Sequence, residues 1–168
     1  MLGLGSLNVR GRGGVKSILK RGIQLWLDFN KSEIIGSEEV VNGDFATDLS
    51  GWNFAYTNAT NTITWNNGRV EMIADGSTSL KLAQSIFEVG KTYEIEFDAY
   101  NITGAGFKVF DGGTILTMQS DGHYKFYHTA LSSPLNIYRN AASQASSGEF
   151  DNISVKEVTQ FVKDKSPN

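Results

Sequence analysis

One polar stretch of the sequence, from Tyr56 to Asn67, combines side chains that suit sugar binding. Sugar recognition needs flat aromatic faces against the C–H side of the ring, with amide, carboxylate or guanidinium groups for the hydroxyls. We expect Trp65 to stack on a sugar, assisted by residues of suitable type, namely Tyr56, Asn67, Arg69, Asn136 and Tyr138. The alternative is that these side chains pack on strand faces or between subunits.

Catalytic side chains are sparse by comparison. His123 and His128 lie five residues apart on one expected strand, so they point to opposite faces and cannot hold one metal ion together. Glu94, Glu96 and Asp98 share a strand face. Paired carboxylates are typical of glycosidases, but acids in a row on the outer face of a strand are ordinarily solvated. The chain has no cysteine, and we expect a protein that is not an enzyme.

Charge is unevenly distributed along the chain. The net charge of the 168 residues is −3, yet residues 1–22 hold five basic and no acidic side chains, which leaves −8 for the remainder. Because this segment is also rich in glycine, we expect an extended, flexible arm that docks on an acidic partner surface rather than on nucleic acid. Its basic residues are Arg10, Arg12, Lys16, Lys20 and Arg21.

Apolar runs in the sequence are short. None approaches the roughly 20 residues that cross a bilayer, and the N-terminal residues lack the apolar stretch of a signal peptide. We therefore expect no membrane partner.

Short segments of alternating polarity follow one another after Glu39, each closed by Gly, Asn or Asp. Asn-Gly and Asp-Gly pairs between them are typical of tight hairpin turns, and no long helical pattern intervenes. These spacings predict an all-β, antiparallel two-sheet sandwich. The expected strands are 40–45, 52–58, 62–65, 69–74, 79–86, 92–101, 106–111, 114–119, 123–130, 135–139 and 149–158.

The chain divides into four parts on these criteria. We expect the arm at 1–22, an anchoring strand and linker at 23–38, the sandwich at 39–160 and a C-terminal tail at 161–168. Apolar residues from Val15 onward have a helical period that changes to a strand period, which predicts a short helical turn and then a strand at 23–29. The polar segment 30–39 is expected to be a connector.

Two motifs at the ends of the sandwich carry a family resemblance. Val40–Trp52, VVNGDFATDLSGW, and Gly148–Val158, GEFDNISVKEV, resemble the jelly-roll carbohydrate-binding modules of the galactose-binding-like superfamily, including modules found in bacteriophage structural proteins. The resemblance implies that the first and last segments lie side by side. It also implies buried aromatic anchors, which here are Phe45, Trp52 and Phe150.

Many members of this family bind a structural calcium ion between the same two ends. The resemblance implies Asp151, with Asp44 and Asp48 nearby, as its ligands, although Ala46 stands where relatives often have Glu. Calcium takes about six to eight oxygens, so carbonyls or waters would have to complete the shell. We favour the alternative without a cofactor, in which Asp44 caps a turn and Asp151 pairs across strands.

The resemblance, the basic arm and the missing catalytic set lead to one hypothesis. We expect a structural protein of a bacteriophage particle, either a capsid decoration or minor capsid protein or a tail-associated one, on the virion surface. The arm would anchor it to capsid or tail subunits, as a homo-oligomer, and the jelly roll would face outward. The alternative is a carbohydrate-binding module that recognises surface glycans, and weak glycan binding is compatible with both.

Overall fold

The computed structural model describes residues 17–20, 23–26, 33–141 and 143–160 of the chain, with side-chain placements for 35–141 and 143–159. Two compact units are present, Ile35–Thr159 and a unit made of Met1–Ile34 with Gln160–Asn168, and each is described by itself. Four basic residues of the expected arm lie outside the described residues, namely Arg10, Arg12, Lys16 and Arg21. Lys20 lies at the end of a short strand.

That short strand belongs to an antiparallel pair. In it β1 (Ser17–Lys20) runs against β2 (Ile23–Trp26). The expected strand at 23–29 is confirmed over 23–26, whereas the expected helical turn before it is wrong. A four-residue apolar pattern fits either period, and pairing with β2 supplies the backbone hydrogen bonds that a single helical turn lacks.

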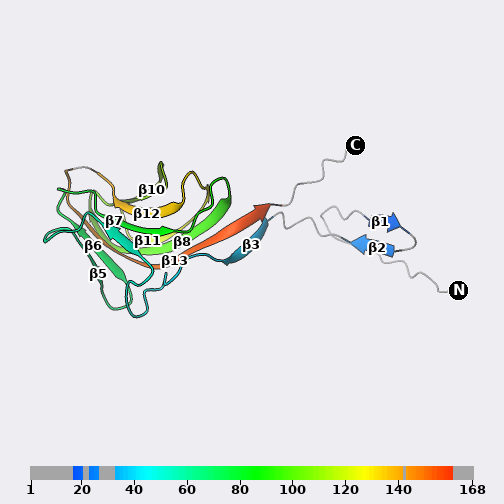
Figure 1. The fold of residues 1–168 in the computed structure, drawn as a ribbon, viewed down its shortest axis with the longest axis horizontal. Coiled ribbons are helices and arrows are strands. Elements are labelled where there is room, and N and C mark those ends of the chain that lie inside the picture. The colour runs from blue at the N-terminus through cyan, green and yellow to red at the C-terminus, as the bar shows by residue number, and fades with distance from the viewer. Residues whose placement is uncertain (1–16, 21–22, 27–32, 142, 161–168) are drawn as a thin grey trace. The chain divides into compact units, whose positions relative to one another are not determined.

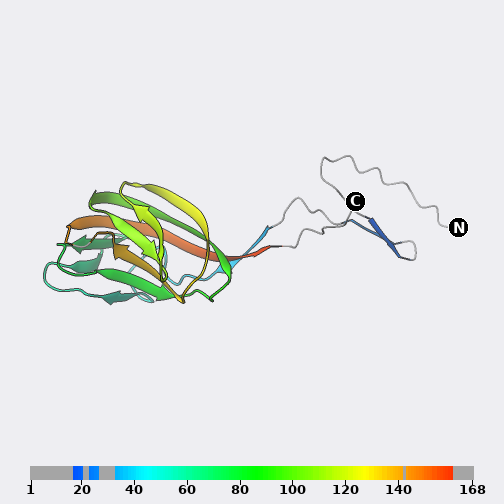
Figure 2. The ribbon, with the colours of Figure 1, turned by 90° about the horizontal axis from the view of Figure 1, so that it is seen from above.

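The larger unit is all-β, as Figures 1 and 2 show from two directions. Its strands form two antiparallel sheets, and no helix occurs among the described residues, so none is available to span a membrane. The expectation of an antiparallel two-sheet sandwich is confirmed. The five-stranded sheet has the order β10 (Thr114–Met118), β9 (Phe107–Phe110), β12 (Pro134–Arg139), β7 (Lys81–Ser85) and β4 (Asn53–Ala55).

The six-stranded sheet contains the longest strands of the unit. The strand β8 alternates strictly from Tyr93 to Ala99, so that every second side chain in this range is buried. This sheet has the order β11 (Gly122–Thr129), β8 (Thr92–Gly104), β13 (Ser146–Gln160), β6 (Val70–Ala74) and β5 (Thr62–Trp65), with β3 (Glu33–Glu38) also paired to β13.

The opening and closing segments of the unit lie side by side, as the two motifs predict. Ile153 N donates to Gly43 O at 2.9 Å, and Glu39 N donates to Val155 O at 2.9 Å. The expected strand at 40–45 is wrong, however, because this segment is irregular and turns. Phe45 has a φ of 44°, in the left-handed region that interrupts an extended strand.

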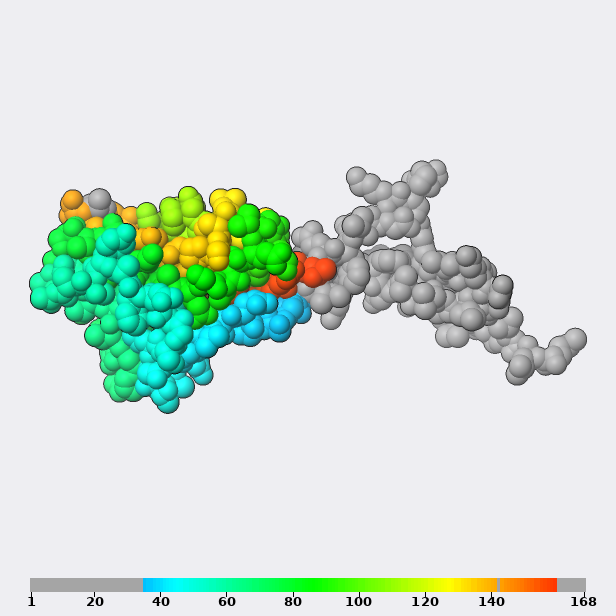
Figure 3. Space-filling model, in the orientation of Figure 1, coloured from blue at the N-terminus to red at the C-terminus, as the bar shows by residue number. Residues whose placement is uncertain are grey.

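A strand occupies the segment that we expected to be a connector. β3 pairs with β13, and Figure 3 shows its blue surface against the orange-red end of β13. The carboxylate of Glu38 accepts hydrogen bonds from Val155 N at 2.7 Å and Ser154 Oγ at 2.6 Å. Glu38 of β3 is therefore held by residues distant in sequence, and such a pairing cannot be predicted from the local pattern of polar and apolar residues.

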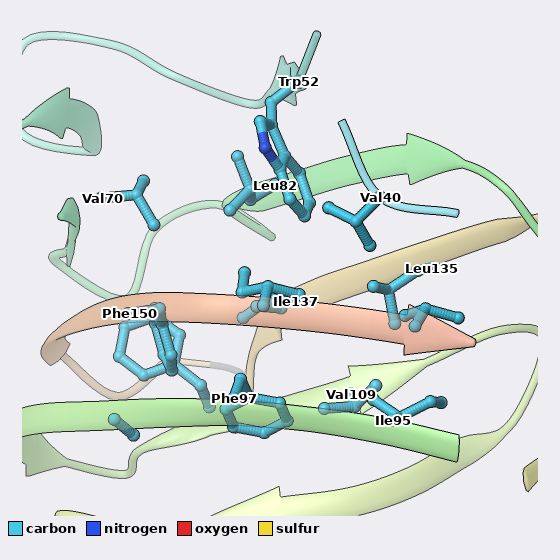
Figure 4. Packing of buried hydrophobic residues seen from close by; sticks show 14 of the residues in the cluster. Val40, Trp52, Val70, Leu82, Ile95, Phe97, Val109, Leu135, Ile137 and Phe150 are labelled. Atoms are coloured by element: carbon cyan, nitrogen blue, oxygen red, sulfur yellow. The ribbon is translucent and has the colours of Figure 1, made fainter. Parts of the chain in front are cut away.

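The three expected aromatic anchors are buried in one core. Phe45 and Phe150 are fully buried and Trp52 is 6% exposed. The rings of Phe45 and Trp52 lie 5.6 Å apart, and Trp52 Nε1 donates to Asn42 O at 3.0 Å. Figure 4 shows Trp52 beside Leu82, and Phe150 on β13. The opening motif Val40–Trp52 therefore contributes side chains to the core.

Candidate functional site

The outer face of the five-stranded sheet, away from the core, carries aromatic and basic side chains in register. On β12, Leu135 and Ile137 are buried in the core. Because successive side chains of a strand alternate between faces, Asn136 and Tyr138 belong to the outer face. The same alternation on β9 and β7 brings their outward residues into rows with those of β12.

Tyr138 lies at the centre of one such row. Strand register places it opposite Lys81 of β7 on one side and Lys108 of β9 on the other. The Lys81 ammonium lies 5.9 Å from the centre of the Tyr138 ring. Phe110, in the neighbouring row, meets Tyr138 edge to face, with ring centres 5.5 Å apart and planes at 82°. We call these four residues and their surroundings the Tyr138 face.

A pocket of about 250 Å³ opens on the Tyr138 face. Two nearly perpendicular rings and several N–H donors line it, and these are the groups that a sugar ring and its hydroxyls require. The lining residues are Ser79, Lys108, Phe110, Tyr138, Arg139 and Asn140.

Asn136 has a supporting place in this face. It is 4% exposed, and its Nδ2 donates to Phe110 O at 2.9 Å and Pro134 O at 3.0 Å. Both of its amide hydrogens are therefore used within the sheet. Asn136 holds the backbone that carries Phe110 and is not free to bind a sugar hydroxyl through its amide nitrogen.

Trp65, Asn67 and Arg69 lie elsewhere, in β5 and the β5–β6 turn of the six-stranded sheet. The structure does not bring them together with Asn136 and Tyr138, so the six expected sugar-binding residues do not form one site. The indole of Trp65 is 42% exposed, but its Nε1 donates to Phe45 O at 2.6 Å.

Arg69 is also engaged within the protein. Its Nη1 donates to Glu149 Oε2 at 2.9 Å, and its guanidinium lies 3.7 Å from the centre of the Tyr100 ring. The hydrogen bond to Glu149 raises the pKa of Arg69. Tyr56, the remaining expected residue, is an exposed residue that directly follows β4 and has a φ of 64°.

The three acids that could mimic a glycosidase pair lie on the outer face of the six-stranded sheet. Lys125 Nζ binds both Glu94 Oε1 at 2.9 Å and Glu96 Oε2 at 3.0 Å. These bonds raise the pKa of Lys125 and lower that of Glu94. Hydrogen bonds from Asn152 and then His123 lower the pKa of Asp98. The three carboxylates belong to a network of ion pairs and hydrogen bonds on the outer face of the sheet.

The two histidines point to opposite faces, as their spacing predicts. His123 Nδ1 binds Asp98 Oδ1 at 2.8 Å on the outer face. His128 points inward, where its Nε2 binds the fully buried Asp111 at 2.7 Å. Asp111 also accepts a hydrogen bond from Leu131 N at 2.7 Å. This inner pair ties β11 to the turn after β9 and so joins the two sheets.

The aspartates expected as calcium ligands do not assemble. Among the residues with described positions, no group of three or more His, Cys, Asp or Glu is placed to hold a metal ion. Asp48 Oδ1 accepts from Ser50 N at 2.9 Å and from Asn42 Nδ2 at 3.3 Å, which lowers its pKa. Burial raises the pKa of Asp151. The three aspartates therefore do not form the cluster of carboxylates that the resemblance implies.

Lys81, Lys108 and Phe110 belong to this face but were not predicted from the sequence. Lys108 and Phe110 alternate with the buried Phe107 and Val109 in the four residues of β9, a pattern that marks an outward aromatic and an outward cation. What the pattern does not contain is the register that places them beside Tyr138, which lies 28 residues further along.

No family model and no curated protein sequence matches the chain. Solved structures similar to it include the CBM22-1 xylan-binding domain of Paenibacillus barcinonensis Xyn10C, at 11% identity over 76% of this chain and 96% of that one, with a TM-score of 0.49. The N-terminal cellulose-binding domain of Cellulomonas fimi β-1,4-glucanase C matches at 13% identity over 76% and 99%, with a TM-score of 0.47.

A third similar structure is the enzymatically active domain of tailspike protein 4 from bacteriophage CBA120. It matches at 16% identity over 71% of this chain, with a TM-score of 0.44, and the chain spans only 21% of its length. Carbohydrate-binding modules and a phage tailspike domain are thus among the solved structures to which this chain is similar.

Proposed function

We propose that the unit Ile35–Thr159 is a non-catalytic glycan-binding module and that the Tyr138 face is its binding surface. The observation that carries this proposal is the edge-to-face pair of Tyr138 and Phe110 beside an open pocket lined by basic and amide side chains. Neither ring is in the core cluster, and no hydrogen bond from the Tyr138 hydroxyl occurs within the described part of the chain. The surface therefore has aromatic area and a hydroxyl available for a ligand.

Stacking on this face fits the physics of sugar binding. A pyranose presents C–H groups on one side, which pack on an aromatic ring, and hydroxyls at its rim, which need donors and acceptors. Rings at 82° to each other offer two walls to one sugar. Lys108 in the pocket lining supplies donors for the hydroxyls of a stacked sugar, whereas the amide nitrogen of Asn140 already donates to Ala105 O at 3.0 Å.

Substitution of Tyr138 on a glycan array tests this proposal. Tyr138→Ala should abolish binding to the glycans on the array that bind the unaltered chain. The free energy of unfolding should change by no more than about 1 kcal/mol, because the side chain is half-buried and lies outside the core. Tyr100→Ala is a matched control, because Tyr100 is a half-buried tyrosine on the outer face of the other sheet. Equal glycan binding by Tyr138→Ala and the unaltered chain would refute the proposal.

A second proposal concerns the chain as a whole: it is a structural component of a bacteriophage particle, displayed on the virion surface. The charge contrast along the chain favours this proposal. Residues 1–22 have a net charge of +5, which complements an acidic partner surface, whereas residues 23–168 have a net charge of −8. Capsid or tail subunits in repeated copies would supply such a surface, and a homo-oligomer would multiply weak contacts.

Deletion of residues 1–22 tests this second proposal. The truncated chain should fail to copurify with assembled particles while retaining its glycan binding. Replacement of the five basic residues by glutamine should have the same effect while the chain keeps its full length. Full retention of the truncated chain on particles would contradict the proposed docking role.

A further inference from the structure

Charge separates the two sheets of the domain. The strands of the five-stranded sheet contain Lys81, Lys108 and Arg139 and no Asp or Glu. Residues 23–168, which include this sheet, have a net charge of −8, so a sheet whose strands lack acids stands out within them. The acidic residues of strands β5, β6, β8, β11 and β13 are Glu71, Glu94, Glu96, Asp98, Glu149, Asp151 and Glu157.

The two lysines of the Tyr138 face have no carboxylate partner within the described ranges. Lys91 and Lys125, by contrast, each bind two glutamates. Lys81 and Lys108 instead hold their ammonium groups over aromatic rings, 5.9 Å from the centre of Tyr138 and 5.6 Å from the centre of Phe110. Each of the two rings of the Tyr138 face therefore has an ammonium group nearby that lacks a carboxylate partner among the described residues.

A third cation lies in the wall of the same pocket. Arg139 is 8% exposed, and its Nη1 donates only to backbone carbonyls, those of Ala141 and Gln144. Its buried Nε has no hydrogen-bond partner among the described residues. Buried charges are normally paired, because leaving water is costly without a counterion. Arg139 follows Tyr138 on β12 and its side chain belongs to the core side of the sheet, so it adds a positive charge near the pocket that no carboxylate pairs with within the described ranges.

These cations discriminate between ligands. A neutral sugar that stacks on Tyr138 must displace the Lys81 ammonium from the ring and offers it only hydroxyls in return. A sugar with an anionic substituent offers the displaced ammonium a charge-assisted hydrogen bond, which is about twice as strong as a neutral one. None of the residues that line the pocket is acidic, so no carboxylate in its lining repels such a ligand.

We therefore propose that the Tyr138 face binds an anionic glycan, in which sugar rings carry carboxylate or sulfate groups that pair with Lys81 and Lys108. This inference rests on the glycan-binding function proposed above and adds the ligand class. The shared chemistry is a negatively charged group at the rim of a stacked ring. A carboxylate would come from a uronic or sialic acid, and a sulfate from a sulfated polysaccharide.

An array of neutral, uronate-containing, sialylated and sulfated glycans, probed with the full chain, provides the test. The retained glycans should be anionic, and the type retained distinguishes carboxylate from sulfate. For the best-bound glycan, calorimetric titration should show at least a tenfold loss of affinity when its carboxylates are reduced or its sulfates removed. Lys81→Gln and Lys108→Gln should each weaken binding about tenfold, as loss of one charge-assisted hydrogen bond does.

Lys156→Gln is the matched control, because it removes one lysine charge from β13 in the other sheet and should leave affinity unchanged. Binding of neutral glycans that depends on Tyr138 but not on the two lysines would overturn the inference and leave the glycan-binding function standing. Retention of no glycan at all would overturn both. Stronger retention of a single-stranded oligonucleotide through the same lysines would overturn the ligand class.

Discussion

Alanine at Gly43 will destabilise the larger unit by about 3 kcal/mol. A Cβ at this position would lie 1.9 Å from Ile153 O, a backbone atom that cannot rotate away, and 3.0 Å from Val40 Cγ1. The opening segment must shift by more than 1 Å to relieve this contact, which breaks the 2.9 Å hydrogen bond from Ile153 N to Gly43 O. The lost hydrogen bond costs about 1 kcal/mol and the overpacking about 2 kcal/mol more.

Urea unfolding followed by tryptophan fluorescence measures this cost, because Trp52 is buried beside the altered segment. With a slope of about 2 kcal/mol per molar urea, the midpoint should fall by about 1.5 M. Gly113→Ala is the matched control, since its nearest neighbour, Leu131 Cδ1, would be 3.9 Å away and its φ is not positive. A Gly43→Ala midpoint equal to that of Gly113→Ala would show that the opening and closing segments do not meet as described.

Three further predictions concern stability away from the proposed binding surface. Hydrogen bonds, first among them that from Ser77, hold the pKa of Asp75 well below its ordinary value of 3.8. The contribution of Asp75 to the free energy of unfolding is therefore fully present above pH 3.8 and is lost as the pH falls below it. In Asp75→Asn the free energy of unfolding should fall less steeply with decreasing pH than in the unaltered chain. Gly68→Ala should cost about 1 kcal/mol in thermal unfolding, because Gly68 has open space around it but a φ of +84°. Arg69→Ala should cost about 1 kcal/mol through loss of its surface pair with Glu149 and its ring contact, and calorimetric titration should show unchanged glycan affinity.

Local signals in the sequence predict much of the fold. The Asn67-Gly68 pair forms the expected tight turn, with both residues at positive φ and two backbone hydrogen bonds between Asn66 and Arg69. The alternation of β8 places its apolar side chains in the core as expected. These features are local, because turn chemistry and side-chain period are set by neighbouring residues.

The candidate site was only half predictable because it depends on pairing between distant strands. Tyr138 was identified by type, but Lys81 and Lys108 become its neighbours only through the register of β7, β12 and β9. The same limit explains β3, whose polar residues pair with β13 more than a hundred residues away. Trp65, the residue best suited by type, is on the other sheet and donates its indole N–H to the backbone of the opening motif.

Chemical-shift mapping during a glycan titration tests the location of the binding surface most directly. The domain should be labelled with ¹⁵N and titrated with the best-bound glycan from the array. The backbone amides of β9 and β12, from Phe107 to Phe110 and from Leu135 to Arg139, should shift in a saturable way, while those of Thr62–Trp65 stay in place. Shifts centred on Thr62–Trp65 and the β5–β6 turn, with β9 and β12 unchanged, would contradict the assignment of glycan binding to the Tyr138 face.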